Sequence, residues 1–385
     1  MSASEQWHYD EELGLWLRNT IHQMGRRCHN WDYLGTGSYL ITINQADRAR
    51  PLLGKLVGTC ADDARIELSE LGRQIEEQCR RIGEITPAIA VLRVQLMPEH
   101  LHLVLQVRRR LSRHLGTILR GFKGTCSKLC WKLYGVEENR APLFEAGFVD
   151  TILFDAQSLD NALAYAADNP RRLWEKLAHP ECFTVLRDLT CRLHLGHECA
   201  AHFTAIGNQH LLDAPVRLQV QCSRKDFAYR RGTDGILLKE APPAIRTEHF
   251  QAKYDALLAA AQHGAVLVSP CISQGEKEIA RLACAAGHSV IVLANKGFSP
   301  RFKPAGKYFD QCAAGKLLML APSEWPYLPG EKKITRTDAC ILNRLAQAIA
   351  GPNALEIRYQ GFVPHELDAL AMKAVRAKPL PRPPA

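Results

Sequence analysis

The segment 94–105 constrains the fold of this chain most, because apolar and polar side chains alternate along its second half with the period of a β-strand. Successive side chains of a strand point to opposite faces, so His100 and His102 share one face while the leucines between and after them enter a core. Two histidines one residue apart on a rigid strand can ligate the same metal ion. Taken alone, such a pair is more often two ordinary strand histidines, so a second feature of the sequence has to decide.

That second feature is the segment 159–170, which we predict to be a short helix. Apolar residues recur in it at helical spacing, and we expect Pro170 to end the helix. Tyr165 and Asn169 are one helical turn apart and therefore share a face. A phenol can act as a covalent nucleophile, and an amide oxygen can ligate Mg²⁺ or Mn²⁺. The alternative is a packed tyrosine followed by an ordinary Asn-Pro helix stop.

Together these two segments resemble the single-tyrosine HUH transposases, and most of all the REP-associated, insertion-sequence-like tyrosine transposases. The segments that carry the resemblance, in family order, are 32–43, 97–102, 119–124, 143–153 and 165–170. They cover roughly residues 30–180. Two positions depart from the family pattern. Val149 stands where the family usually has an aromatic residue, often Tyr, and Glu99 stands where it often has Asn.

The resemblance implies a metal-dependent endonuclease and strand transferase that acts on single-stranded or hairpin DNA. It assigns the nucleophile to Tyr165, which would form a 5′-phosphotyrosine intermediate. It assigns the Mg²⁺ or Mn²⁺ ligands to His100, His102 and Asn169, where the metal would polarise the scissile phosphate. A phosphotyrosine retains the energy of the phosphodiester, so no ATP is needed, and the sequence contains no Walker-type phosphate loop.

A run of basic residues follows the histidine strand and continues along an expected helix. The residues that we expect to contact DNA phosphates are Arg108, Arg109, Arg110, Arg113, Arg120 and Lys123. The net charge of +9 fits an acidic polymer as partner. The alternative for this run is a solvated helix face. Phe122, Trp131 and Tyr134 could stack on unpaired bases or pack into a core, and we favour the core for Trp131.

Apolar strands alternate with helices in the C-terminal half, which predicts a parallel, doubly wound α/β sheet. The expected strands are 216–223, 265–270, 289–294 and 316–321, and the expected helices are 248–262, 275–286 and 337–351. This half resembles the Rossmann-like superfamily that contains DNA-processing protein A and the lysine-decarboxylase-like nucleotide hydrolases. The segments that carry this resemblance are 222–224, 269–278, 287–293 and 343–351.

The second resemblance points to a nucleotide or DNA-phosphate site at a strand-to-helix turn, where helix amides can bind an anion. The residues that it suggests are Ser223, Arg224, Ser269, Ser273 and Gly275. An ordinary turn, with Ser and Gly as helix caps, is the equal alternative. The sequence contains no Gly-x-Gly-x-x-Gly motif, which argues against a dinucleotide redox cofactor.

The expected fold class is therefore α/β, with an HUH domain of antiparallel sheet and helices (a ferredoxin-like or RRM-like α+β fold) and a Rossmann-like domain. The expected parts are a helical extension at 1–30, the HUH domain at 31–185, a connecting hairpin at 186–210, the Rossmann-like domain at 211–355, and a tail at 356–385 whose Pro-rich end is disordered. A cluster of Cys and His between 191 and 202 has zinc-ligand residue types, but alternating strands would direct them to opposite faces, so we disfavour zinc.

The remaining expectations concern compartment and alternative functions. Thirteen cysteines without an export signal predict free thiols and a cytoplasmic location, and no apolar run is long enough to span a membrane. Both a monomer and a homodimer stay open. One alternative function is a domesticated DNA-binding regulator that keeps the fold without meaningful turnover. Another is nucleotide binding or sensing through the C-terminal domain.

Overall fold

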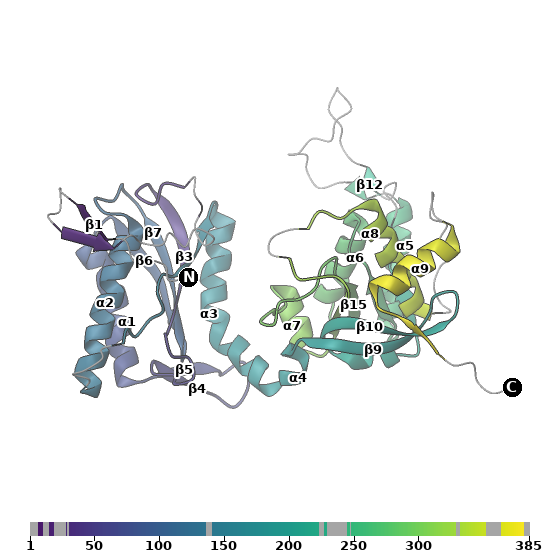
Figure 1. Ribbon diagram of the computed structural model, residues 1–385, viewed down its shortest axis with the longest axis horizontal. Coiled ribbons are helices and arrows are strands. Elements are labelled where there is room, and N and C mark those ends of the chain that lie inside the picture. The colour runs from purple at the N-terminus through teal and green to yellow at the C-terminus, as the bar shows by residue number, and fades with distance from the viewer. Residues whose placement is uncertain are drawn as a thin grey trace, which may run out of the picture. The chain divides into compact units, whose positions relative to one another are not determined.

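The computed structural model divides the chain into two compact units, Met1–Glu175 and Lys176–Ala385, which are described separately below. The residues that the structure describes are 7–10, 15–18, 28, 31–135, 141–222, 227–228, 245–246, 248–328, 332–351 and 363–380. The α/β fold class predicted from the sequence is confirmed (Figure 1).

The first unit is built on a four-stranded antiparallel sheet with the strand order β6-β7-β3-β8. Its strands are β3 (Gly37–Asn44), β6 (Ile89–Leu96), β7 (His100–Val107) and β8 (Val149–Leu153). Its helices are α1 (Glu70–Ile85), α2 (Leu115–Tyr134) and α3 (Ala156–Ala178), which runs three residues past the boundary. Two hairpins complete it, β1 (Trp7–Asp10) with β2 (Leu15–Arg18) and β4 (Gly54–Val57) with β5 (Arg65–Leu68).

Helices cover both faces of this sheet, α1 and α2 on one side and α3 on the other (Figure 1). Alternate residues of β3 and β7, such as Ile41 and Leu103, pack against α1 and α2 in the larger core. On the opposite face, Val104 packs against Ala162 and Ala166 of α3. Odd-numbered residues of β7 therefore face the main core, and even-numbered residues face α3.

The second unit contains a seven-stranded sheet with the order β11-β14-β15-β16-β10-β17, and β9 also pairs with β10. Its strands are β9 (Leu186–His194), β10 (Glu198–Gly207), β11 (Arg217–Gln219), β14 (Val266–Ser269), β15 (Val290–Leu293), β16 (Leu317–Pro322) and β17 (Lys378–Pro379). A further short pair is formed by β12 (Phe227–Ala228) and β13 (Ile245–Arg246). β11, β14, β15 and β16 are parallel, whereas β10 is antiparallel to β16.

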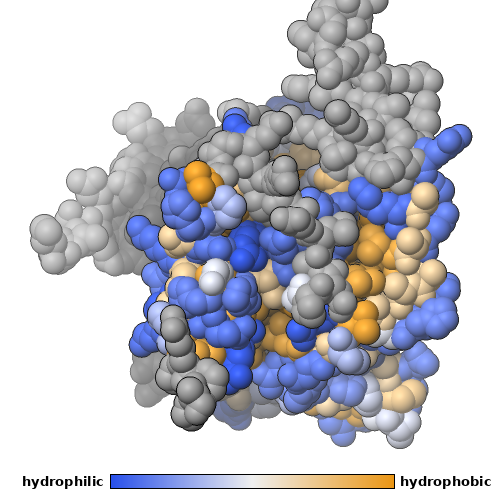
Figure 2. All heavy atoms as spheres, turned by 90° about the vertical axis from the view of Figure 1, so that its right-hand side faces the viewer, coloured by the Kyte–Doolittle hydropathy of each residue, from blue (hydrophilic) through white to orange (hydrophobic). Residues whose placement is uncertain are grey.

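The helices of this unit are α4 (Pro180–Phe183), α5 (Glu248–Gln262), α6 (Gln274–Ala285), α7 (Lys307–Ala313), α8 (Arg336–Ala350) and α9 (Pro364–Ala374), with a 3₁₀ turn η2 at Gln209–Asp213. The strand residues that pack with α8 and α9 are Val266, Val268, Ile291, Leu293, Leu318 and Leu320. Those that pack with α4 to α7 are Leu267, Val290, Val292 and Leu317. This alternation confirms the doubly wound sheet. Hydrophilic side chains cover most of the face of this unit in Figure 2, with apolar patches between them.

Three expectations about the connecting parts are wrong. Within residues 1–30, Trp7–Asp10 and Leu15–Arg18 are two antiparallel strands rather than a helix, and both contain aromatic residues, which favour strands. The hairpin expected as a connector is β9 and β10, and it belongs to the sheet of the second unit. The expected tail contains α9 and β17, because Leu367 and Ala371 are buried against α8 and β17 pairs with β10. Residues 381–385 lie outside the described part.

Among the described residues, no helix is both long enough and apolar enough to cross a membrane.

Candidate active site

The two histidines of β7 lie on the sheet face that α3 covers, as their spacing predicts. Their rings are edge-to-face, with 4.9 Å between centroids. His102 is buried, with 4% of its surface exposed, and His100 is half-buried at the start of the strand. A buried imidazole such as that of His102 is a polar group that a core contains only when it has hydrogen-bond partners.

A row of paired residues crosses the sheet at His102. Thr42 of β3 pairs with His102 on one side and with Val149 on the other, and Gln95 of β6 pairs with His102 from the far side. Directly opposed residues share a face, so this row points toward α3. The Thr42 hydroxyl lies 2.9 Å from His102 Nδ1. When Nδ1 carries the proton and donates it to Thr42, the lone pair is on Nε2, which is then the nitrogen suited to a metal.

Helix α3 supplies the other two predicted residues. The rings of Tyr165 and His102 are edge-to-face, with centroids 5.7 Å apart. Tyr165 is 42% exposed, so its phenol is accessible from solvent, whereas Asn169 is buried. The Asn169 amide nitrogen donates to the backbone carbonyl of Tyr165 at 2.8 Å, which makes the amide oxygen the atom available to a cation. The structure thus brings Tyr165 to the histidine strand and fixes the side chain of Asn169 one turn later.

The prediction that this helix ends at Pro170 is wrong, because α3 continues to Ala178. A proline inside a helix removes one backbone hydrogen bond and bends the helix. Ion pairs span this point: Arg171 binds the Asp168 carboxylate through two nitrogens at 2.5 and 2.9 Å, and its guanidinium is 3.9 Å from Glu175. Pro170 is itself buried. We attribute the continued helix to these ion pairs and to the packing of its buried side.

Sequence reasoning missed two neighbours of the site, Thr42 and Arg172. The guanidinium carbon of Arg172 lies 5.5 Å from the centroid of the Tyr165 ring, and only 14% of the Arg172 side chain is exposed. Arg172 follows Tyr165 by two helical turns, so helical periodicity could have identified it. Thr42 could not be found from its own segment, because its position beside His102 depends on the pairing of β3 with β7.

The three predicted metal ligands would offer two imidazole nitrogens, from His100 and His102, and one amide oxygen, from Asn169. Mn²⁺ accepts such a mixed set, whereas Mg²⁺ prefers oxygen ligands and retains waters. Within the described part of the chain, no group of three or more His, Cys, Asp or Glu could hold a metal. A bound ion would therefore take its other ligands from water and phosphate oxygens, as metal ions in phosphoryl-transfer sites do.

The predicted basic residues do not converge on this site. His100 pairs with Asn44 at one end of β3, and Val107 pairs with Gly37 at the other end. At a rise of about 3.3 Å per residue, the two ends of β7 are roughly 23 Å apart. Arg108, Arg109 and Arg110 directly follow Val107, at the end of β7 that is remote from His100. The predicted Arg120 and Lys123 belong to α2, which packs on the opposite face of the sheet from α3.

These basic residues differ in their surroundings. The exposed ones are Arg108, Arg109, Arg110, Arg113 and Arg120. Arg110 also forms an ion pair with Asp32 at 2.7 Å. Lys123 is half-buried, its ammonium donates to the backbone carbonyls of Glu145 and Gly147, and burial lowers its pKa. The structure thus gives Lys123 the role of holding a loop.

The three aromatic residues near this basic run also differ in how exposed they are. Phe122 is buried in the main core. Trp131 is partly buried and donates from its indole nitrogen to the Ala141 carbonyl at 2.9 Å, whereas Tyr134 is 46% exposed. Tyr134 is the most exposed of these three residues.

At the strand-to-helix turn between β14 and α6, the side chain of Glu276 occupies the backbone amides that a phosphate would need. Ser223 and Arg224 lie outside the described residues, whereas Ser269 is fully buried and Ser273 caps α6. A carboxylate oxygen of Glu276 accepts from the amides of Ile272 and Ser273 at 2.8 and 2.9 Å. Burial of Glu276 raises its pKa. The sequence suggests that the amides of this turn could bind a phosphate. Because Glu276 already accepts from them, the structure favours the alternative, an ordinary capped turn.

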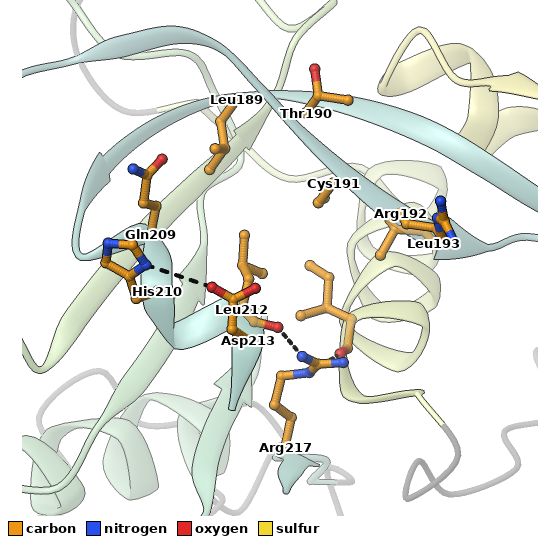
Figure 3. A pocket seen from close by; sticks show the side chains of 11 residues that line it. Leu189, Thr190, Cys191, Arg192, Leu193, Gln209, His210, Leu212, Asp213 and Arg217 are labelled. Atoms are coloured by element: carbon orange, nitrogen blue, oxygen red, sulfur yellow. Dashed lines mark hydrogen bonds and ion pairs between the residues drawn. The ribbon is translucent and has the colours of Figure 1, made fainter. Parts of the chain in front are cut away.

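A separate cavity of about 400 Å³ lies between β9, η2, β11 and the end of α8 (Figure 3). Arg217 donates from Nε to the Ile349 carbonyl at 2.7 Å and from another nitrogen to the Leu212 carbonyl, so it holds the backbone at the end of α8. Burial raises the pKa of the Cys191 thiol to about 12, which disfavours its reactive thiolate form. We assign no chemistry to this cavity.

Comparison with known proteins gives limited similarities. No family model and no curated protein matches the chain. Among solved structures, a REP-associated tyrosine transposase bound to a REP hairpin is 14% identical, with a TM-score of 0.28 over 37% of this chain and 72% of that one. A putative transposase from Deinococcus radiodurans R1 is 10% identical, with a TM-score of 0.24 over 37% and 95%. DNA processing protein A from Helicobacter pylori is 19% identical, with a TM-score of 0.27 over 45% and 68%. Similarities this low carry no conclusion about function.

Proposed function

We propose that this chain is a single-tyrosine HUH transposase-like enzyme, which cuts single-stranded or hairpin DNA and rejoins its ends. The observation that supports the proposal most is the placement of Tyr165 against His102, on the same sheet face as His100. A solvent-accessible phenol beside a buried and a half-buried imidazole is a combination suited to metal-assisted nucleophilic phosphoryl transfer.

In the proposed reaction, the Tyr165 oxygen forms a bond to phosphorus while the bond from phosphorus to the 3′ oxygen breaks. The phenol proton passes to solvent, and the departing oxygen takes up a proton to become a 3′-hydroxyl. The DNA keeps its 5′ phosphate as a phosphotyrosine ester, which a second 3′-hydroxyl can attack to restore a phosphodiester. Each step exchanges one ester for another, so no nucleotide cofactor is consumed.

The side chains around Tyr165 have distinct roles in this proposal. His100, His102 and Asn169 would hold Mg²⁺ or Mn²⁺, which as a Lewis acid would stabilise charge on the scissile phosphate. Thr42 orients His102 through the bond to Nδ1. The guanidinium of Arg172 lies 5.5 Å from the Tyr165 ring and 3.9 Å from the Asp168 carboxylate, and it would place a cation beside the nucleophile.

The test is covalent capture of DNA. Wild-type protein is incubated with 5′- and 3′-labelled single-stranded oligonucleotides drawn from the flanks of its own gene, with and without Mn²⁺, and resolved on a denaturing protein gel. We expect a Mn²⁺-dependent adduct that Tyr165→Phe abolishes. Tyr134→Phe, at another exposed tyrosine, should retain the adduct. An adduct of undiminished yield in Tyr165→Phe would contradict the proposal.

One observation favours a second candidate function, binding of DNA without turnover. Val149 stands next to Thr42 in the row that contains His102, at a position where the resembled family usually has an aromatic residue. A substitution in the row that contains His102 is expected of a regulator that had lost turnover. Tight binding of single strands by wild-type protein, with no adduct in Mn²⁺ or Mg²⁺, would establish this candidate.

A further inference from the structure

Trp31 and Phe154 form an aromatic pair at the end of the first unit's sheet that is remote from His100. Phe154 directly follows β8, whose last residue Leu153 pairs with Ser38 near the start of β3. The two rings meet edge-to-face, with centroids 5.5 Å apart and planes at 89°. Phe154 is 77% exposed, so most of its ring is in solvent.

Trp31 is a fixed support for this exposed ring. Its indole nitrogen donates to the hydroxyl of Tyr39 at 2.9 Å, and Tyr39 is fully buried. Gly37 leaves room for the indole, because a Cβ at that position would come within 3.3 Å of Trp31 Cζ2. Tyr33 stacks on Tyr39 from farther along the same loop. A ring held in this way needs little ordering when it binds a ligand.

A basic loop, residues 108–113, adjoins the aromatic pair. Arg110 forms an ion pair with Asp32, the residue next to Trp31, at 2.7 Å. The backbone amide of Leu111 donates to the carbonyl of Leu34 at 2.8 Å, which fixes the loop against the segment that contains Trp31. The loop's exposed cations are Arg108, Arg109, Arg110 and Arg113.

Each of the three carboxylates near this surface has a hydrogen-bond or ion-pair partner, and for Asp32 that partner is Arg110 of the loop itself. Arg110 pairs with Asp32, the Tyr33 hydroxyl donates to Asp150 at 2.7 Å, and Asp155 accepts from the Ser158 amide at the start of α3 at 2.7 Å. Four arginines against these three carboxylates leave a local net charge of +1. Exposed aromatic surface together with excess positive charge is the composition of surfaces that bind unpaired nucleotides.

We propose that Phe154, Trp31 and the loop 108–113 form a docking surface for single-stranded DNA. An unpaired base stacks on Phe154, and the arginines of the loop bind the phosphates on either side of it. In a duplex, neighbouring bases cover both faces of each base, so this surface selects unpaired strands. The inference rests on the proposed function, and it gives the DNA a second contact roughly 23 Å from the histidines along β7.

The test uses full-length protein with Tyr165→Phe and no divalent metal, so that cleavage plays no part. Binding of fluorescent oligo(dT) is followed by anisotropy. Phe154→Ala should weaken binding by about 5- to 100-fold, the loss usual for one stacked base. Phe154→Leu, which keeps apolar bulk, should lose nearly as much. Tyr327→Ala, at an exposed ring of the second unit to which no binding role is assigned, is the control and should bind like the parent.

The phosphate contacts have their own readout. Arg109→Ala and Arg113→Ala should each reduce the slope of log affinity against log salt by about 0.7, the value for one phosphate of a single strand. Arg80→Ala, at an exposed arginine of α1, should leave the slope unchanged. An oligonucleotide with abasic sites in place of bases should bind the parent weakly, and Phe154→Ala should then cause no further loss.

Two results would overturn the inference: unchanged affinity for oligo(dT) in Phe154→Ala, or an equal loss for duplex DNA of the same length. The proposed function is judged separately, from the adduct formed by protein with Tyr165 intact. An adduct together with unchanged binding in Phe154→Ala refutes only the docking surface. No adduct together with weakened binding in Phe154→Ala refutes only the nuclease.

Discussion

The ring of Tyr165 meets the ring of His102 edge-to-face, with 5.7 Å between their centroids. The contact joins α3 to β7, the two segments that the sequence marks as the source of the site. Because α3 packs Ala162 and Ala166 on Val104 of the same strand, the contact is part of the packed face of the sheet. The geometry of the candidate nucleophile is therefore set by the core beneath it.

The bond from Thr42 to His102 should control metal affinity. Thr42→Val keeps the shape of the side chain but removes the partner of His102 Nδ1. Losing such an orienting partner typically costs 10- to 100-fold in metal affinity, and we expect a Mn²⁺ dissociation constant weaker by about that factor. Isothermal titration with Mn²⁺ measures it. Thr42→Ser retains the hydroxyl and should bind Mn²⁺ nearly as well as wild type, whereas equal losses in both variants would contradict this role.

Lys123 should matter for stability more than for DNA binding. Lys123→Met removes the donor to the carbonyls of Glu145 and Gly147 and leaves them less satisfied in a partly buried place. We expect a loss of about 1–3 kcal/mol in the free energy of unfolding, measured with urea. Arg120→Met, at an exposed arginine of the same helix, is the control and should change stability by less than about 0.5 kcal/mol. A larger loss of stability in Arg120→Met than in Lys123→Met would refute the structural role given to Lys123.

Glu276 should make the stability of the second unit depend on pH. Burial raises its pKa in the folded chain, so its contribution to stability is complete below the pKa of an unfolded glutamate, about 4.3, and is lost as pH rises through the higher folded value. Glu276→Gln, which can still accept an amide hydrogen bond, should flatten the pH dependence above about pH 4.3. Denaturation midpoints measured from pH 4 to pH 8 test this. Glu324→Gln, at an exposed glutamate, should preserve the wild-type profile.

Thiol reactivity should follow burial. Cys28 and Cys60 are exposed, whereas burial raises the pKa of Cys126, Cys284 and Cys312 to about 12. Since the thiolate is the reactive form, we expect Cys28 and Cys60 to react with a disulfide reagent at pH 8 within minutes, and the three buried thiols to react only after unfolding. Peptide mapping after timed labelling measures this. Rapid labelling of Cys312 in folded protein would contradict the packing described for α7.

The local parts of the site were predictable from the sequence. Period-two alternation placed His100 and His102 on one face of β7, and helical spacing placed Tyr165 and Asn169 on one side of α3. The doubly wound sheet followed from apolar strands alternating with helices, and α5 has the predicted bounds. These features depend on short-range geometry, which a sequence pattern encodes directly.

Features that depend on pairing across the chain were not predictable in this way. The position of Thr42 beside His102 requires the register of β3 on β7. The distance of Arg108 from the histidines, in contrast, follows from the rise of β7 itself and could have been predicted. The helix stop expected at Pro170 failed because ion pairs and packing outweigh the local cost of a proline. The turn at Ser269–Gly275 contains a carboxylate from Glu276, which only the folded geometry places on the amides.

Identification of the residue joined to DNA tests the central claim most directly. The adduct formed with Mn²⁺ is digested with nuclease and trypsin, and mass spectrometry locates the remaining phosphonucleotide on the protein. The predicted result is a 5′-linked nucleotide on Tyr165, with none on the other tyrosines. A nucleotide on any other residue, with Tyr165 unmodified, would contradict the assignment of Tyr165 as the nucleophile.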